Sequence, residues 1–512
     1  MEGPAPSATA HLQIKPVAPP ARANRGYAAD QSFMTVQAAF WTVGVLVDLF
    51  VMVRAILLKD REPIARAAWV LLIVVLPLGG AVAYLLFGEP WMSGRFRRHA
   101  DGVYKELLAC ASPVSRPERS EAGHDTFLNA FKTCEGVSKW RTVPGNVARV
   151  AQDSDAAIEM IVGDIGRAER TVHLSMYIWL GDHNGLKVAE AICTAARRGV
   201  RCRIVADAIG SRSFIRSRHW TAMSDAGASL CSSLKVPFGL AFLAGRRVDL
   251  RNHRKIVVVD GQITYCGSQN CADPAFLIKK KYAPWVDIMI RYEGPIVRQA
   301  EIIFASDWTV ETGEDLRDLI RLTDPAPIAG GFDAIASGTG PLSPKGDMAG
   351  IFVAVIAAAQ RSLVITTPYF APDTTVLAAI VSAARRGVAV SIVFPHRNDS
   401  RALGSISRAY YPELAQAGAR IFEYRGGLLH AKTIVADGTV GLVGSANMDR
   451  RSLDLNFENN VLFDSVDLCR DVSAHQQRWL SNCIEISREA ITRRSILREF
   501  GDNLLTMVAP LF

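Results

Sequence analysis

The sequence contains no pair of cysteines at C-x-x-C spacing. Its nine cysteines are scattered through 512 residues and are odd in number. This argues against a disulfide framework and against a cysteine-based zinc site. No carboxylate cluster offers another metal site. We therefore expect buried thiols in a reducing compartment, with no metal and no cofactor.

We also expect no cleavable secretion signal, because the first apolar run begins too far from Met1 and has no cleavage-type end. Residues 1–32 are rich in proline and alanine and show no apolar periodicity. We predict that they form a disordered tail. The remaining chain is too long for one core, so about two or three folded units are expected.

Charged residues are absent from Ala67 to Phe87, a run of about the 20 residues that a helix needs to span a bilayer. Residues 33–58 are also mostly apolar, but they include Asp48. A buried carboxylate is costly in a membrane unless it pairs, here within the hairpin or with another copy's Arg54. We predict a transmembrane helical hairpin over residues 33–90, with spans at about 33–58 and 67–87.

Basic residues are more numerous outside the turn of this hairpin than beside it. The positive-inside rule then favours cytoplasmic chain ends. We predict a multi-pass protein of the cell inner (plasma) membrane whose folded domains are cytoplasmic, joined to the hairpin by a linker at 91–139. The net charge of +8 and the isoelectric point of about 9.0 suit an anionic partner, either a lipid surface or nucleic acid. The sequence leaves homo-oligomerisation open.

The rest of the chain repeats one order of elements. The hexapeptide Ala-Ala-Arg-Arg-Gly-Val occurs at 195–200 and again at 383–388, each time at the end of a helical pattern between two β-rich segments. The repeat predicts an α/β fold built by internal duplication. We place the first domain at 140–325 and the second at 326–512, meeting at a Gly/Pro-rich connection at about 325–345.

Each half contains the pattern H-x-K-x-x-x-x-D followed by G-S-x-N. The first copy comprises His253, Lys255, Asp260, Ser268 and Asn270, and the second comprises His430, Lys432, Asp437, Ser445 and Asn447. On a strand, residues i and i+2 share a face, so the histidine and lysine of each copy point the same way. Such a pair suits a phosphate, because lysine binds the charged oxygens and histidine reacts. Serine and asparagine can donate further hydrogen bonds to the phosphate.

Displacement at a phosphodiester needs a nucleophile and an acid on the leaving-group side. Two facing halves supply both, one histidine forming a phosphohistidine and the other moving the proton. A carboxylate should fix the tautomer of each histidine. We expect Glu458 to orient His430 and Asp287 to orient His253. Asp260 and Asp437 belong to the motifs and are counted with the catalytic residues, although each precedes a glycine and suits a structural turn.

The paired motifs resemble the phospholipase D superfamily. The second copy, with G-S-A-N-M-D-R-R-S at 444–452 and N-F-E at 456–458, is similar to the bacterial cardiolipin synthase branch, as is the amino-terminal hairpin. The resemblance implies two α/β/α domains related by a pseudo-twofold axis, with one active site between them. It also implies phosphatidyl transfer between two phosphatidylglycerol molecules, with His253 as nucleophile. Two departures are Ser268, where this branch is expected to have a second glycine, and Ser175, where glutamate is common.

Other readings remain open. Another phosphatidyltransferase or a phospholipase D would use phosphatidylethanolamine, serine or water as the second substrate. A membrane-tethered nuclease would use the same histidines, but the hairpin argues against a nucleic-acid partner and favours anionic phospholipid in the membrane. Residues 236–244 form a candidate membrane-insertion loop. The terminal residues 504–512 are apolar, and we expect them to pack against the domain.

Overall fold

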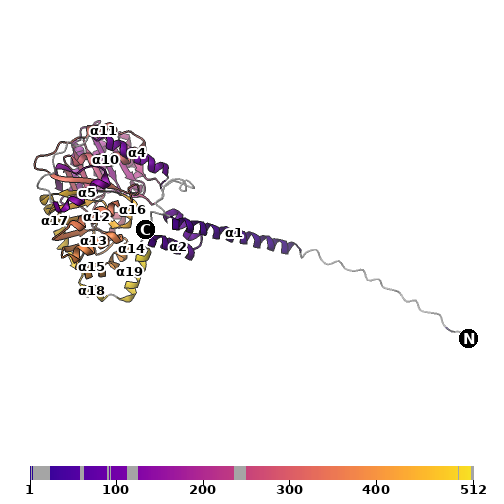
Figure 1. Ribbon diagram of the computed structural model, residues 1–512. Coiled ribbons are helices and arrows are strands. Elements are labelled where there is room, and N and C mark those ends of the chain that lie inside the picture. Colours follow the sequence, from indigo (N-terminus) through magenta and orange to yellow (C-terminus); the bar gives the residue numbers. More distant parts are fainter. Residues whose placement is uncertain are drawn as a thin grey trace. The chain divides into compact units, whose positions relative to one another are not determined.

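The computed structural model describes residues 1, 3, 24–57, 63–88, 92, 94–111, 125–235, 249–493 and 495–508. They form two compact units, Met1–Leu85 and Leu86–Phe512 (Figure 1). The predicted disordered tail lies mostly outside the described residues. Where it is described it is partly wrong, because helix α1 (Asn24–Leu57) already begins at Asn24. The prolines that discourage a helix end at Pro20.

The amino-terminal unit is built from α1, α2 (Pro63–Val75) and α3 (Gly79–Ala83), with a π-helical turn η1 (Tyr84–Gly88) at its end. Helix α1 contacts both α2 and α3, as expected of a hairpin. The predicted second span is not one continuous helix. It breaks at Pro77, which has no N–H to donate, and Leu78 takes a φ of 59°. Among the described residues, only α1 is long and apolar enough to cross a membrane, over Val36–Leu57.

The hairpin explains why Asp48 is tolerated in α1. Its two carboxylate oxygens lie 2.9 and 3.1 Å from the backbone nitrogen of Leu78 and accept its hydrogen bond. Leu78 is the residue before α3, so this N–H would otherwise lack a helical acceptor. Pairing within the hairpin is therefore confirmed, with the broken backbone of the second apolar run as the partner.

The predicted linker at 91–139 is wrong for its described residues. Helix α4 (Gly94–Cys110) packs against α10 (Ile296–Thr312) and α11 (Arg317–Leu322). Helix α5 (Leu128–Ser138) packs against α12 (Asp347–Ala358). Both helices bury apolar side chains, such as Leu107 and Phe131, and are therefore part of the main unit.

The main unit is organised by one sixteen-stranded sheet, in which fifteen strands follow one another and the short β5 (Arg251–Asn252) lies off this order. Read outward from its centre, the first half contributes β1 (Val143–Val150), β9 (Met289–Glu293), β7 (Ile263–Gly267), β6 (Ile256–Val259), β2 (Thr171–Met176), β3 (Arg201–Asp207) and β4 (Ser229–Ser233). The second half contributes β10 (Phe332–Thr339), β19 (Asn456–Asp464), β17 (Val440–Gly444), β16 (Thr433–Ala436), β11 (Ser362–Thr366), β13 (Ala389–Pro395), β14 (Arg420–Tyr424) and β20 (Cys483–Glu485).

The two halves join where β1 and β10 pair in antiparallel. From this seam outward, corresponding strands follow in the same order, which confirms the internal duplication. The predicted Gly/Pro-rich connection at 325–345 is too long, because β10 lies inside it. The glycines and prolines of this stretch are atypical of a strand, so β10 was not predicted. Its residues are nearly all buried at the seam of the sheet.

Helices cover both faces of the sheet, which confirms the α/β/α class (Figure 1). The alternation along β6 shows this: Ile256 and Val258 pack in one cluster with α10, whereas Val257 and Val259 pack in another with α6 (Ser154–Arg167) and α7 (His183–Arg197). In the second half, α12 and α13 (Thr374–Arg385) cover one face and α17 (Val466–Leu480) covers the other. The shorter helices of the main unit are α8 (Arg212–Ile215), α9 (Arg218–Asp225), α14 (Arg401–Ala409), α15 (Tyr411–Ala417), α16 (Arg450–Asp454) and α18 (Arg488–Thr492).

The repeated hexapeptide ends α7 and α13, and the glycine after each helix has a φ of +90°. This left-handed conformation is typical of a glycine that follows the end of a helix. Seven of the nine cysteines are buried thiols, and Cys110 and Cys483 are partly exposed.

The two segments predicted to approach lipid have different outcomes. Residues 236–244 lie outside the described residues. Helix α19 (Ile496–Val508) packs on α14 through Leu505, as expected, but Leu504 and Met507 are exposed. The last residues, 509–512, lie outside the described part.

Candidate active site

Each motif histidine follows a two-residue strand that pairs with the opposite half. Strand β5 (Arg251–Asn252) pairs in parallel with β19 of the second half. Strand β15 (Leu428–Leu429) pairs in parallel with β8 (Trp285–Val286) of the first half. The backbone nitrogen of His253 donates to Phe457 O at 2.9 Å, and that of His430 donates to Val286 O at 2.7 Å. Each histidine is therefore positioned by the other half of the chain.

The orienting carboxylates are crossed in the same way. Nδ1 of His253 lies 2.8 Å from Oε2 and 3.0 Å from Oε1 of Glu458. Nδ1 of His430 lies 2.7 Å from Oδ1 of Asp287. The two carboxylates were identified correctly, but the predicted pairing of Glu458 with His430 and Asp287 with His253 is wrong. The prediction paired each histidine with the carboxylate of its own half. The strand pairs β5–β19 and β15–β8 instead bring each histidine next to the carboxylate of the other half.

The serine hydroxyls of the two G-S-x-N segments make hydrogen bonds within the protein and are not free to bind a phosphate. Ser268 Oγ donates to Asp287 Oδ1 at 2.6 Å and accepts from the backbone nitrogen of Ile288 at 3.1 Å. Ser445 Oγ donates to Glu458 Oε2 and accepts from the backbone nitrogen of Asn459 at 2.9 Å. The prediction of phosphate-binding serines is corrected: both hydroxyls fix the carboxylates that orient the histidines.

The preceding glycines allow this arrangement. A Cβ at Gly267 would lie 2.2 Å from Ile288 O, and a Cβ at Gly444 would lie 2.2 Å from Asn460 Oδ1. The close approach is therefore to the neighbouring strand, and it brings each serine hydroxyl under its carboxylate.

Both motif lysines are buried, and each lies on the same side as its histidine. Lys255 Nζ donates to His253 O at 2.7 Å, and Lys432 Nζ donates to His430 O. Burial lowers the pKa of Lys255 to about 8 and that of Lys432 to about 7, although Asp287 and Glu458 oppose the shift. Each lysine also lowers the pKa of the histidine of the other half, so the four groups share one site.

The histidine rings are held in the neutral form. Burial lowers the pKa of His253 to about 4, against the opposing effect of Glu458. Burial and the charge of Lys432 lower the pKa of His430. With Nδ1–H donated to a carboxylate, Nε2 of each ring is left with its lone pair. Burial raises the pKa of Glu458, but the hydrogen bonds from His253 and Ser445 and the charge of Lys255 hold it below its usual value.

The two Nε2 atoms differ in their surroundings. Lys432 Nζ lies 2.9 Å from Nε2 of His430. Among the described residues, nothing makes a hydrogen bond to Nε2 of His253. In the second half, Nε2 of His430 is therefore occupied by a contact with Lys432. In the first half, the lone pair on Nε2 of His253 is available to attack an electrophile.

The motif asparagines keep unused polar atoms in the site. Asn270 accepts from the backbone nitrogen of Ile178 at 3.2 Å, but its Nδ2 is buried without a partner among the described residues. The buried side-chain oxygen of Asn447 is likewise unpartnered there. A buried polar group left without a partner is costly unless a ligand satisfies it.

Asn459 is a positioning residue that the motif search missed. Its Oδ1 accepts from the backbone nitrogen of Lys255 at 2.9 Å, and its Nδ2 donates to Lys255 O at 3.2 Å. Asn459 directly follows Glu458 in the sequence. This position was the only feature of the sequence that could have indicated its role.

Aromatic rings enclose the histidines and were also missed. The ring of Tyr177 lies 4.7 Å from that of His253, and Lys255 Nζ lies 5.2 Å from the Tyr177 centroid. Trp285 lies 4.7 Å from His430, and Tyr369 lies 6.3 Å from it. These rings restrict water near the lysines and support the lowered pKa values.

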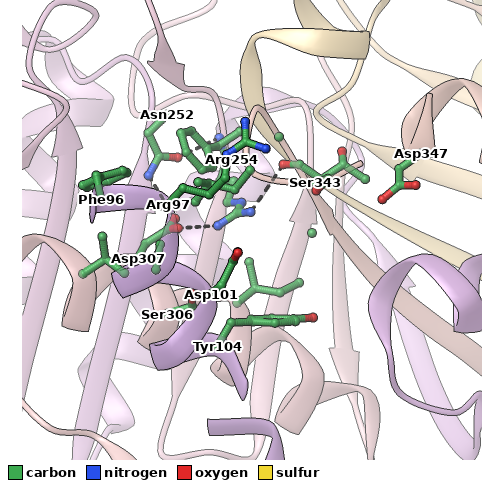
Figure 2. A pocket seen from close by; sticks show the side chains of 18 of the residues that line it. Phe96, Arg97, Asp101, Tyr104, Asn252, Arg254, Ser306, Asp307, Ser343 and Asp347 are labelled. Atoms are coloured by element: carbon green, nitrogen blue, oxygen red, sulfur yellow. Dashed lines mark hydrogen bonds and ion pairs between the residues drawn. The ribbon is translucent and has the colours of Figure 1, made fainter. Parts of the chain in front are cut away.

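The residues on either side of His253 point away from it into a separate cavity of about 460 Å³, shown in Figure 2. Asn252 donates to Asp307 at 3.0 Å, and the Arg254 guanidinium forms an ion pair with the same carboxylate. Arg254 also donates to Glu458 O at 3.1 Å. This network anchors both β5 and β19 and therefore fixes the histidine–carboxylate pair from behind.

Asp260 and Asp437, counted with the catalytic residues, are structural. The Asp260 carboxylate accepts from the backbone nitrogens of Glu169, Arg170 and Thr171 at 2.7–2.9 Å. Asp437 accepts in the same way from Gln360, Arg361 and Ser362. Both take a positive φ, 53° and 55°, in the turn that follows β6 or β16. The turn reading of the sequence is confirmed, and these contacts favour a structural role for both residues over the predicted catalytic one.

Within the described ranges, no group of three or more histidine, cysteine, aspartate or glutamate side chains is arranged to hold a metal ion.

Comparison with known proteins agrees with this geometry. Residues 161–308 and 352–480 match the family described as "Cardiolipin synthase, PLD-like domain". Residues 40–89 match the family described as "Phospholipase_D-nuclease N-terminal".

Curated relatives match over most of their length. Cardiolipin synthase A of Citrobacter koseri is 34% identical over 496 residues, which cover 94% of this chain and 99% of the relative. Cardiolipin synthase A of Escherichia fergusonii is 35% identical over 467 residues, which cover 89% and 94%. The crystal structure of phosphatidylserine synthase from Haemophilus influenzae superposes with a TM-score of 0.54 at 14% identity, covering 74% of this chain and 100% of that one. This last likeness concerns the fold.

Proposed function

The chain belongs to the cardiolipin synthase family with phospholipase D-like domains, and we propose that it transfers a phosphatidyl group from one phosphatidylglycerol to another, giving cardiolipin and glycerol. The family and its relatives support a phosphatidyltransferase acting on membrane phospholipid. The observation that carries the proposal is the crossed pair of histidines, each oriented by a carboxylate from the other half.

In the first step, Nε2 of His253 attacks the phosphorus of the donor lipid. On binding of the lipid phosphate, His430 first takes up a proton from solvent at Nε2. The bond from phosphorus to the glycerol headgroup oxygen then breaks, and His430 delivers this proton to that oxygen. Glycerol leaves, and the phosphatidyl group stays on His253 as a phosphohistidine. Glu458 stabilises the positive charge that develops on the His253 ring.

In the second step, Nε2 of His430 takes the proton from a glycerol hydroxyl of the second phosphatidylglycerol. That oxygen attacks phosphorus, and the bond from phosphorus to His253 breaks. Cardiolipin leaves and both histidines return to their starting state. Asp287 holds the His430 tautomer through both proton transfers.

The assignment of His253 as nucleophile rests on the difference between the two Nε2 atoms. An attacking nitrogen needs a free lone pair, and His253 has one. His430 is linked at Nε2 to the Lys432 ammonium, which suits a group that exchanges protons. When a phosphate enters, Lys432 turns toward its oxygens, and the phosphate charge raises the pKa of His430 into the range of a useful acid.

Lys255, Lys432 and the unpartnered Nδ2 of Asn270 stabilise the charge on the phosphoryl oxygens. The phosphate charge also compensates two buried ammonium groups, whose pKa values burial has lowered. The first half thus supplies the nucleophile and one lysine, and the second supplies the proton-transfer group and the other.

The direct test is to incubate purified full-length protein in detergent with labelled phosphatidylglycerol, alone and then with phosphatidylethanolamine or serine. We expect cardiolipin and free glycerol from phosphatidylglycerol alone. Cardiolipin formed only when phosphatidylethanolamine is present would change the second substrate. Release of phosphatidic acid alone would indicate a phospholipase D, and cleavage of single-stranded DNA without cardiolipin would contradict the proposal.

We further propose that the protein is multi-pass in the plasma membrane, with both ends and the main unit in the cytoplasm. Helix α1 is apolar and long enough to span, and Asp48 caps the broken second apolar run, which lets a helix–break–helix segment return through the bilayer. A reporter fused after Phe512 that works only in the cytoplasm should be active. Activity of a reporter that requires the periplasm would contradict this orientation.

A further inference from the structure

Seven of the large apolar side chains exposed on the main unit belong to two short elements. One is the 3₁₀ turn η4 (Leu277–Tyr282), where Leu277 is 63% and Ile278 is 62% exposed. The other is α19, which exposes Ile496, Leu497, Phe500, Leu504 and Met507. The remaining exposed large apolar residues among the described part of the main unit are scattered along the chain: Phe87, Val147, Ile209, Leu322, Val466 and Ile484. Scattered exposure is ordinary, but a concentration of this kind indicates a docking surface.

Turn η4 is attached to residues that surround His430. Phe276, at its start, stacks on Trp285 with ring centroids 3.8 Å apart, and Trp285 lies 4.7 Å from the His430 ring. Lys279 forms an ion pair with Asp399, and that carboxylate accepts a hydrogen bond of 2.6 Å from Tyr369 beside His430. The exposed Leu277 and Ile278 are thus carried on a turn that is anchored twice to the surroundings of His430.

Helix α19 exposes its apolar residues along a single face. At about 100° per residue, the five exposed apolar side chains fall within about one quarter to one third of the helix circumference. The opposite face packs on α14: Asp502 lies 3.8 Å from the Arg408 guanidinium, and Leu505 packs with Ile406. The apolar face is therefore not the one that attaches the helix to the protein.

One segment connects the two elements. Asp399 holds Lys279 of η4, and α14, which begins two residues later, packs against α19. Exposed lysines, Lys280 and Lys281, follow the aliphatic pair of η4, and the exposed Arg401 begins α14. Apolar side chains bordered by basic ones fit the interface of a bilayer that contains anionic lipid.

We propose that η4 and α19 form one membrane-docking surface that rests on an anionic bilayer and presents lipid headgroups to His430. The inference deepens the proposed function, because a two-tailed substrate stays in the bilayer while its phosphate enters the site. A bilayer is favoured over a second copy of the chain, because Lys280 and Lys281 of two copies would repel each other while anionic lipid attracts them.

The test reads lipid contact directly. Full-length protein is reconstituted in vesicles of phosphatidylcholine and phosphatidylglycerol, with or without brominated acyl chains, as Leu277→Trp, Phe500→Trp and Leu322→Trp. The wild-type signal from its nine tryptophans is subtracted. We expect brominated lipid to quench the probes at 277 and 500, and to leave the probe at 322, which is 75% exposed, unquenched.

Quenching at 277 or 500 no stronger than at 322 would overturn the proposal. Emission that changes with protein density in the vesicle instead would assign the surface to another copy of the chain and would also overturn it. The same probes are measured in a His253→Ala background. Quenching by brominated lipid needs no turnover. Quenching without cardiolipin formation would therefore contradict only the proposed reaction, and cardiolipin formation without quenching would contradict only the docking surface.

A kinetic test uses Leu277→Ser/Ile278→Ser with Leu322→Ser as the matched control. The double variant should lose at least several-fold in transfer rate on vesicle substrate and keep its rate on a short-chain phosphatidylglycerol dispersed as monomers. Equal loss on both substrates would mean that the turn acts on the catalytic groups, and no loss on either would mean that it does not dock. Either result contradicts the proposal.

Discussion

Nδ1 of His253 lies 2.8 Å from Oε2 of Glu458, although 205 residues separate them in the chain. The reciprocal contact joins His430 to Asp287. Each contact crosses between the two duplicated halves, so neither half contains a complete histidine–carboxylate pair. This explains why one chain carries both copies. Without the second half, His253 would lose Glu458, which orients it, and the site would also lose His430, which transfers the proton.

The crossed pairing predicts different defects for two similar substitutions. Glu458→Gln weakens stabilisation of the charged His253 ring, so formation of the covalent intermediate should slow by about 10²–10⁴-fold. Asp287→Asn affects proton transfer by His430. A substrate with a p-nitrophenol headgroup needs no proton to leave, so intermediate formation should recover in Asp287→Asn and stay slow in Glu458→Gln.

Rapid-quench measurement of p-nitrophenol release, beside release of glycerol from the natural lipid, checks this. Recovery in Glu458→Gln and not in Asp287→Asn would instead support pairing within each half.

The pH dependence should be set on its alkaline side by the buried lysines. Burial lowers the pKa of Lys432 to about 7, so the free protein loses this ammonium as pH rises through that value. Phosphate binding needs the charge, and kcat/KM should therefore fall above about pH 7. Lys432→Arg stays charged throughout, so its alkaline limb should move to higher pH, even if its maximum rate is lower. An alkaline limb that stays in place in kcat/KM profiles of Lys432→Arg would contradict the role of this lysine.

Asp260 and Asp437 should affect stability and leave the chemistry intact. Each carboxylate accepts three backbone hydrogen bonds. Asp260→Asn or Asp437→Asn keeps a side chain that tolerates positive φ but removes the charged acceptor, at a cost of about 1–3 kcal/mol in the free energy of unfolding.

Thermal unfolding and kcat should be measured on the same preparations of these two variants. A lowered unfolding temperature with kcat within about twofold of wild type is expected. A loss of kcat by orders of magnitude at unchanged stability would return both residues to the catalytic set.

Several features were predictable because they are local. Strands β6 and β16 are of this kind, since an apolar run follows each His-x-Lys, and the left-handed glycines follow from helix ends. The identities of the site residues followed from repetition, because two copies of one motif make chance unlikely as an explanation. The turn role of Asp260 was likewise visible from the glycine that follows it.

What could not be predicted depends on pairing between distant strands. The exchange of Glu458 and Asp287 requires β5 to join β19 and β15 to join β8, and no local pattern encodes which short strands meet. The same holds for Ser268 and Ser445, whose acceptors are fixed by that exchange. Strand β10 was hidden by its glycine and by the prolines around it, and Pro77 was overlooked as the break in a run that is otherwise apolar.

The central claim is that His253 carries the phosphatidyl group and His430 moves the proton. The most direct measurement is peptide mass spectrometry of adducts formed from phosphatidyl-p-nitrophenol by His430→Ala and by His253→Ala, quenched and digested at alkaline pH because the phosphohistidine bond is acid-labile. The account predicts an adduct on His253 that accumulates in His430→Ala, because deprotonation of the acceptor is lost, and no adduct in His253→Ala. An adduct on His430 in His253→Ala, with none on His253 in the other variant, would contradict it.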